Sequence, residues 1–355
     1  MGCPELDMTS YLRFVKPDEN PHERLESPTK KTAYSRFSRT VTDDPIGNRI
    51  TSRIDAVTRS YTSNNLNQYS AITNPADDPT YDDDGNMTDC ALSTGAWSYT
   101  WDAENRLTSA VKDEDTKLEF VYDYLSRRVS KKVYSWDTDH WSLTTYNLFI
   151  YNGYRQVERI SVSGETRTII QRFAWSLDDQ LRLIADLSSS TTYSVHHDAN
   201  RNVSELTAPD GSLAAHYEYA PFGALTATTG SYANSNPFRF SSEYFDTETG
   251  LVYYNFRFLS PDLGRFLSKD PIEEEGGWNL YAMVGNNPLN AWDYLGYVGD
   301  DDTIPPPKPG AYGPWYFKPP SWHTNKPDAG KPCCKKPTIL DSITVEFRTF
   351  SATSS

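Results

Sequence analysis

Short stretches in which apolar and polar residues alternate occur along most of the chain, and they predict β-strands. Residues 106–111 and 118–122 place an apolar side chain at about every second position, which gives each strand one apolar face and one mixed face. Turn-forming Asp, Asn and Gly residues separate these stretches. The pattern therefore predicts many short antiparallel strands.

One local pattern recurs about every 20 residues. An aromatic residue and an acid open a turn, Gly or Asn supplies left-handed backbone, and a short strand follows. The copies begin at Tyr81-Asp82, Trp101-Asp102, Tyr122-Asp123, His197-Asp198 and Tyr217-Glu218, with weaker traces at Asp44 and Asn64. A unit of this length fits one β-hairpin. Because one hairpin cannot bury its apolar face alone, neighbouring hairpins must stack or wind together.

The composition favours the same fold class. The 355 residues include 24 Tyr, 15 Phe and 9 Trp, whereas hydrophobic residues make up only 37%. Aromatic rings pack well across the pleated surface of a sheet. We therefore expect an all-β protein, with at most a short helix near residues 279–285.

The repeats resemble YD repeats, in which Tyr-Asp-x-x-Gly-Asn recurs at this period. Residues 236–296 resemble the RHS repeat-associated core, and the resemblance rests on several motifs. These motifs are Asn236-Pro237-Phe238-Arg239-Phe240, Gly264-Arg265-Phe266, Asp270-Pro271, Gly277-Trp278-Asn279-Leu280-Tyr281 and Asn286-Asn287-Pro288. The resemblance divides the chain into an N-terminal segment with degenerate repeats (1–74), a YD-repeat region (75–235), the core (236–296) and a variable tail (297–355).

The RHS/YD-repeat family includes polymorphic toxins and the C components of insecticidal toxin complexes. The resemblance implies a curved, spiralling antiparallel sheet that forms a partial shell. It also implies that the core cleaves itself after a second DPxG-type motif and releases the tail as cargo. An immunity protein is a further partner that such a system implies, and secretion or display on the cell surface is the localisation.

Two aspartates carry the implied self-cleavage. The first motif matches at Asp270-Pro271-Ile272 and the second at Asp293-Tyr294-Leu295-Gly296. Two carboxylates in close contact share one proton, so one can activate water while the other protonates the leaving group. We expect Lys269 or Arg265 to orient a carboxylate or the scissile carbonyl group. The predicted cleavage region is Gly296 and Tyr297.

This sequence departs from the family pattern within both motifs. Glu273 replaces a glycine, and a Glu there disfavours backbone with positive φ and adds a third carboxylate. Tyr294 replaces a proline, which loosens the turn that positions Asp293. Lys269 replaces an arginine and cannot form a bidentate ion pair. An aspartyl autoprotease with degenerate motifs is therefore one hypothesis, and a copy without activity is another.

The charge and the absence of certain motifs argue against several classes of binding partner. The formal net charge of −14 disfavours non-specific binding to nucleic acid. Residues 1–15 lack the pattern of a signal peptide, and no run of 18 apolar residues predicts a transmembrane segment. The four cysteines have neither disulfide-scaffold nor metal spacing, and we expect no metal or cofactor.

A different class of function is a non-enzymatic surface module. Tyrosine and tryptophan rings on a β-surface can stack on carbohydrate, and Trp97, Trp101, Trp136 and Trp141 are the candidates. The tail changes composition abruptly, with prolines from Pro305 onward that favour irregular or polyproline II structure. Residues 343–347 in that tail resemble a strand that could add to a sheet edge.

Overall fold

The computed structural model describes residues 39–54, 56–177, 179–288, 291–293 and 295–296. The predictions for the proline-rich tail and for residues 343–347 lie outside the described residues. Twenty-two strands and three short 3₁₀ helices make up the described fold, so the all-β prediction is confirmed.

The strands form three antiparallel sheets that follow one another along the chain. The first sheet contains β1 (Arg39–Asp43), β2 (Arg49–Ile54), β3 (Val57–Ser63) and β4 (Tyr69–Ile72). The third contains β19 (Tyr244–Asp246), β20 (Leu251–Tyr254), β21 (Arg257–Ser260) and β22 (Arg265–Phe266).

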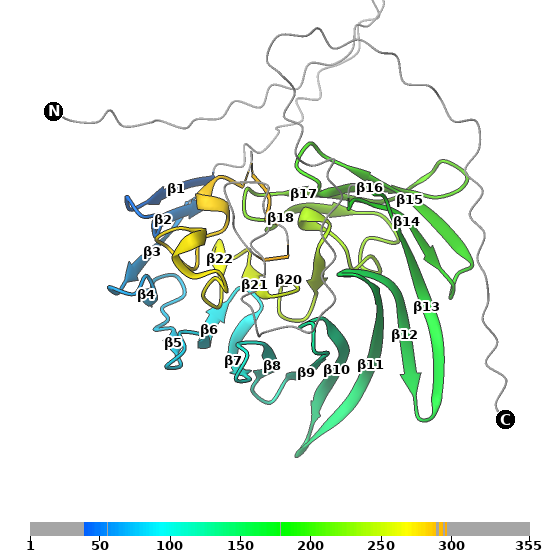
Figure 1. The fold of residues 1–355 in the computed structure, drawn as a ribbon, viewed down its shortest axis with the longest axis horizontal. Coiled ribbons are helices and arrows are strands. Elements are labelled where there is room, and N and C mark those ends of the chain that lie inside the picture. The colour runs from blue at the N-terminus through cyan, green and yellow to red at the C-terminus, as the bar shows by residue number, and fades with distance from the viewer. Residues whose placement is uncertain (1–38, 55, 178, 289–290, 294, 297–355) are drawn as a thin grey trace, which may run out of the picture.

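The second sheet has 14 strands, each paired with its neighbour in sequence. Its strands are β5 (Thr80–Tyr81), β6 (Met87–Leu92), β7 (Gly95–Trp101), β8 (Leu107–Lys112), β9 (Thr116–Tyr122), β10 (Arg128–Asp137), β11 (His140–Asn152), β12 (Arg155–Ser163), β13 (Thr166–Trp175), β14 (Leu181–Asp186), β15 (Thr191–His197), β16 (Val203–Thr207), β17 (Leu213–Tyr219) and β18 (Leu225–Thr229). The sheet curves without closing into a barrel, and we call β1–β18 the shell (Figure 1).

The described residues between 236 and 296, which we call the core segment, lie within the curve of the shell (Figure 1). The 3₁₀ helices η1 (Phe240–Ser242), η2 (Glu273–Gly276) and η3 (Val284–Asn286) belong to this segment. The short helix expected near residues 279–285 is therefore replaced by turns, a bridge between Arg265 and Ala282, and η3. One aromatic and aliphatic cluster contains both shell residues such as Phe120 and core-segment residues such as Phe258.

Most repeats contain the same turn, and its acid explains why the motif begins with Asp. The copy expected at Tyr217-Glu218 is shifted, since its turn follows Tyr219 and has Ala220 in place of the acid. The Asp123 carboxylate accepts the backbone N–H groups of Leu125 at 2.9 Å and Arg127 at 3.0 Å, and also the Arg127 Nε at 2.8 Å. The bond from the backbone N–H group four residues later recurs at Asp44, Asn64, Asp82, Asp102 and Asp198. The weak sequence traces at Asp44 and Asn64 are thus complete turns of the repeat.

The aromatic residue of the motif also has a repeated hydrogen bond. The Tyr122 hydroxyl donates to the Leu107 carbonyl at 2.7 Å, and the Tyr219 hydroxyl donates to the Val203 carbonyl at 2.7 Å. Each accepting carbonyl group belongs to a residue at a shift of the pairing register, which falls between Thr100 and Trp101 opposite Leu107 and between His196 and His197 opposite Val203. Because a bulge leaves backbone groups without a ladder partner, the hydroxyl compensates for a missing hydrogen bond.

The turn hydrogen bonds predict a measurable contribution to stability. Asp123→Ala leaves two backbone donors and a guanidinium without their acceptor, so we expect the free energy of unfolding to fall by about 1–3 kcal/mol. Asp123→Asn should recover part of this loss, because Asn64 makes the same backbone bonds. Urea unfolding followed by tryptophan fluorescence measures the difference. Asp113→Ala, at an exposed position, is the control, and an equal loss in both variants would contradict the role of the turn.

Candidate active site

The two predicted aspartates meet at one arginine. The Arg257 Nη2 lies 2.9 Å from the Asp270 Oδ2 and 3.0 Å from the Asp293 Oδ2. All three side chains are buried, with residue exposures of 1%, 4% and 2%. The structure therefore brings together two carboxylates that are far apart in sequence.

Arg257 also contacts the backbone at the predicted cleavage region. Its Nε donates to the Gly296 carbonyl oxygen at 2.6 Å, and its Nη1 donates to the Leu280 carbonyl oxygen at 3.3 Å. The guanidinium carbon lies 3.7 Å from the centre of the Phe266 ring. The planar fork is thus fixed by an aromatic face and by acceptors on several sides, which a lysine could not reproduce.

Local backbone structure positions each aspartate. The Asp270 N–H donates to the Leu280 carbonyl at 2.8 Å, and its Oδ1 accepts the Ile272 N–H at 3.1 Å. The chain after Asp293 turns through Leu295 (φ 66°) and Gly296 (φ 85°). A Cβ on Gly296 would lie 2.8 Å from the Tyr254 carbonyl oxygen, so only glycine fits there.

Of the motif positions that depart from the family pattern, Glu273 is among those that the structure describes. Glu273 adopts φ 57°, so the structure keeps the left-handed backbone that we expected a glutamate to disfavour. Its side chain is exposed to solvent. Tyr294 and Tyr297 lie outside the described residues. The positive φ at Glu273 costs about 1–2 kcal/mol relative to glycine. In this turn the Glu273 N–H donates to the Asp270 carbonyl oxygen at 3.0 Å.

The cations predicted from sequence have other neighbours. Arg265 donates to the Asn67 carbonyl at 2.5 Å and lies between the rings of Tyr69 and Tyr281, at 4.0 and 4.8 Å from their centres. Lys269 lies against Gly85, where an added Cβ would be 2.3 Å from its Cε. The cation between the carboxylates is Arg257, which the sequence analysis did not select. The available signal was its charge directly before the apolar residues Phe258 and Leu259 in strand β21.

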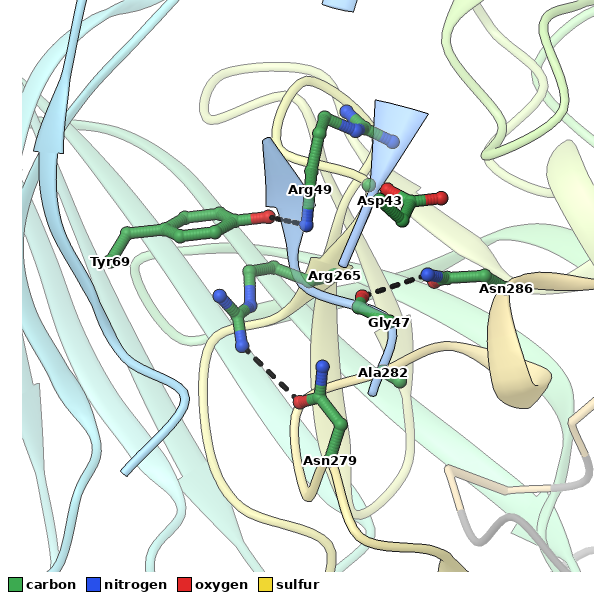
Figure 2. Close-up of a pocket in the computed structure, with 9 residues that line it drawn as sticks. Asp43, Gly47, Arg49, Tyr69, Arg265, Asn279, Ala282 and Asn286 are labelled. Carbon is green, nitrogen blue, oxygen red and sulfur yellow. Dashed lines mark hydrogen bonds between the residues drawn. The ribbon is translucent and has the colours of Figure 1, made fainter. Parts of the chain in front are cut away.

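Arg265 belongs to a small cavity between the first sheet and the core segment (Figure 2). The cavity measures about 10 Å³, which is room for one water molecule at most. The Asn286 amide donates to the Gly47 carbonyl at 2.7 Å, as Figure 2 shows, and the Asn279 amide donates to the Asn48 amide oxygen at 3.0 Å. These contacts join the core segment to the turns of the shell rather than form a ligand site.

Similar bonds recur along the rim of the shell. Core-segment side chains donate to the carbonyl oxygen of the turn residue that has positive φ. Besides Gly47 and Asn67, the acceptors are Gly85 with Tyr281 at 2.7 Å, Ser126 with Tyr253 at 3.2 Å and Arg201 with Ser242 at 2.8 Å. The core segment is therefore positioned by the repeats, and the aspartate pair is positioned with it.

A buried carboxyl group adds a connection that depends on pH. The Glu243 Oε1 in the core segment lies 3.1 Å from the Arg155 Nη1 of the shell, and the Arg155 Nε lies 3.2 Å from the Asp179 Oδ1. Burial raises the pKa of the Glu243 carboxyl to about 7, although the Arg155 guanidinium opposes the shift, and Asp179 raises it further. The Tyr254 hydroxyl is the other titratable neighbour.

The four candidate tryptophans lie in different environments. Trp97 is buried in the core, and its Nε1 donates to the Thr94 hydroxyl at 2.9 Å. Trp101 is half-buried, with its Nε1 bonded to the Met87 carbonyl at 2.8 Å. Trp136 and Trp141 pack edge to face at the tip of one hairpin, with ring centres 5.0 Å apart. Only this last pair lies near the surface as a unit.

The described residues contain neither a metal-binding cluster nor a membrane-spanning helix. No group of three or more His, Cys, Asp or Glu side chains is arranged to hold a metal ion there. Across the same described ranges, no helix has the length and apolar character needed to cross a membrane.

A repetitive β-shell that surrounds its own core segment defines a YD-shell protein. The family model for the teneurin YD-shell matches residues 40–289. The chain therefore belongs to the YD-shell family, and the RHS/YD-repeat resemblance is confirmed.

Named relatives include several toxins. The chain is 30% identical over 219 residues to the tRNA3(Ser)-specific nuclease WapA of Bacillus spizizenii, which covers 59% of this chain and 9% of that protein. It is 28% identical over 226 residues to the double-stranded DNA deaminase toxin A of Burkholderia cenocepacia, covering 57% and 15%. It is 28% identical over 311 residues to the toxin subunit YenC2 of Yersinia entomophaga, covering 77% and 30%.

Solved structures with a similar chain path include TcdB2-TccC3-Cdc42. The TM-score is 0.49 at 18% identity, and the match covers 74% of this chain and 17% of that one. This chain thus spans less than a third of the length of each of these relatives and structures.

The buried carboxyl group predicts how stability changes with pH. Because the folded-state pKa of Glu243 is raised from 4.5 to about 7, its contribution is fully present below pH 4.5 and is lost as the pH rises through 7. The loss should approach about 3 kcal/mol. Glu243→Gln cannot ionise, so urea unfolding of the parent and this variant at pH 5 to 8 should give free energies whose difference changes across that range. Parallel profiles would contradict the raised pKa.

Proposed function

We propose that this chain is a YD-shell module whose core segment cleaves the backbone after Gly296 and so separates the tail from the shell. One observation carries the proposal. A single buried guanidinium contacts both motif carboxylates and the carbonyl oxygen of Gly296. The proposed catalytic carboxylates, the positive charge and the proposed scissile carbonyl group therefore lie next to one another.

The charges of the site fit hydrolysis by an aspartate pair. Two buried carboxylates that contact the same Arg257 nitrogen repel each other when both are ionised, so the proposed pair shares one proton. The ionised carboxylate accepts a proton from water, and the protonated one donates its proton during the same reaction.

The proposed reaction adds one water molecule to one peptide bond. The water oxygen attacks the Gly296 carbonyl carbon, and negative charge develops on the carbonyl oxygen. The Arg257 Nε donates to this oxygen and stabilises that charge. The C–N bond to residue 297 then breaks, its nitrogen takes the proton of the second carboxyl group, and a Gly296 carboxylate and a new N-terminus result. Lys269 and Arg265 act indirectly by fixing the core segment.

The comparisons support a polymorphic-toxin-type context for this activity. Named toxins are among the relatives that share the shell region. In such a system residues 297–355 are the released cargo, an immunity protein is the expected partner, and export from the cell is the expected fate. The cavity beside Arg265 and another beside Glu243 each measure about 10 Å³. We infer that this module alone does not enclose the cargo, because its interior is filled by the core segment.

Intact mass spectrometry of the purified full chain tests the cleavage. We expect two products whose masses place the break between Gly296 and Tyr297. Asp270→Asn and Asp293→Asn should abolish the break, since each removes the ability of the pair to exchange a proton. Arg257→Lys should slow it by at least about 100-fold, the usual effect of removing a donor to the developing oxyanion.

A matched control separates loss of chemistry from loss of fold. Asp262 is another core-segment aspartate paired with an arginine, with its Oδ2 3.2 Å from the Arg59 Nη1. Asp262→Asn should cleave like the parent. An intact parent, or an Asp270→Asn variant that still cleaves, would reject the proposal and leave a shell module without protease activity.

A further inference from the structure

The β10–β11 hairpin carries a strand edge that no described residue covers. β11 pairs with β10 from His140 to Leu148, but its pairing with β12 begins only at Asn147. The outer edge of residues 140–146 is therefore unpaired among the described residues. The hairpin projects at the lower border of the shell in Figure 1, beyond the neighbouring strands. An exposed strand edge of this kind is a template for pairing with another strand.

Backbone groups on this edge point outward at two positions. Asp137 and His140 close a two-residue turn, and the ends of such a turn bond to each other. Hydrogen-bonded pairs alternate along an antiparallel ladder, so Ser142 bonds inward to β10 whereas Trp141 and Leu143 direct their N–H and C=O groups outward. The register of the β10–β11 pair shifts between Val133 and Tyr134, and this β-bulge interrupts the alternation after Leu143.

The side chains beside this edge form an apolar surface. Trp136 opposes Trp141 and Tyr134 opposes Leu143, so these four side chains share one face of the hairpin. Leu143 is 51% exposed, although it is large and apolar. The segment from residue 140 to 144 contains no Asp, Glu, Lys, Arg, Gly or Pro, and such segments have a high tendency to pair as strands.

We propose that this edge docks a second copy of the chain through antiparallel pairing of the two β11 strands about a two-fold axis at Ser142. In that register Trp141 of each copy lies opposite Leu143 of the other. The outward-pointing N–H and C=O groups of Trp141 and Leu143 in both copies are then hydrogen-bonded. The apolar faces of the two hairpins become one surface across the axis, as expected of a self-complementary two-fold interface.

The charges favour a second copy over a charged partner. No like charges face each other in this register, because His140 opposes Thr144 and Ser142 opposes itself. In the proposed dimer, the acidic side chains of the turn, Asp137 and Asp139, do not lie opposite each other across the two copies. The formal net charge of −14 on each chain still produces long-range repulsion, which salt screens. The dimer should therefore strengthen as the salt concentration rises.

Analytical ultracentrifugation of the full chain across a concentration series tests the association. We expect a monomer–dimer equilibrium in the parent. Leu143→Lys places a positive charge beside its counterpart in the other copy, and it should raise the dimer dissociation constant by at least about tenfold. Leu183→Lys is the matched control, because Leu183 is also a strand residue, 38% exposed, but is paired on both sides, with Ala174 and with Ser194. A monomeric parent, or equal association of both variants, would overturn the proposal.

Disulfide trapping tests the register itself. Ser142→Cys lies on the proposed axis, where opposite Cα atoms of a non-hydrogen-bonded pair are about 4.5 Å apart and can form a disulfide. Thr145→Cys lies far from its own counterpart in this register. The variants are made with Cys3, Cys333 and Cys334 changed to serine. Oxidation should crosslink the first variant and not the second, and the reverse result would reject this pairing.

Discussion

A buried ion pair inside an aromatic cage joins the core segment to the shell, and the rest of the structure depends on it. The Arg128 Nη1 of β10 lies 2.6 Å from the Asp246 Oδ2 of β19, and the Lys131 Nζ lies 2.7 Å from the Asp246 Oδ1. Five rings surround the Arg128 guanidinium, with centres between 4.4 and 6.0 Å away. Although burial opposes it, the two cations hold the pKa of Asp246 below its usual range. Removing one partner of such a pair costs about 3–5 kcal/mol, because the other charge is left buried alone.

Around this centre, the repeats and the core segment depend on each other. A turn residue with positive φ directs its carbonyl group toward the core segment, which supplies a donor at one turn after another. The shell is an open sheet and cannot bury its inner face alone. The core segment fills that face and, through β21 and the turns after β22, brings Arg257, Asp270 and Asp293 to a common point. The precision of the aspartate pair is thus a property of the whole shell.

Much of the fold and part of the candidate site could be predicted from local sequence. The Asp-to-backbone bonds of each turn involve residues no more than four positions apart, so the motif that encodes them is visible as a repeat. The aspartates of the core could be selected by their resemblance to family motifs. Arg257 could not, because its role arises from strand pairing that places it beside residues 13 and 36 positions later in the sequence. Lys269 and Arg265 lie close to Asp270 in sequence, but their side chains lie against Gly85 and between two tyrosines.

The sequence by itself determined the all-β class, the repeat period, the turn chemistry and the family, because these follow from alternation and from contacts within one repeat. Tertiary structure alone decided which cation sits between the aspartates and where the left-handed backbone at Glu273 is tolerated. It also decided that the shell is filled by its own core segment and that, among the described strands, one edge of β11 has no pairing partner. Those features depend on how strands distant in sequence curve around one another, and the sum of many side-chain contacts sets that curvature.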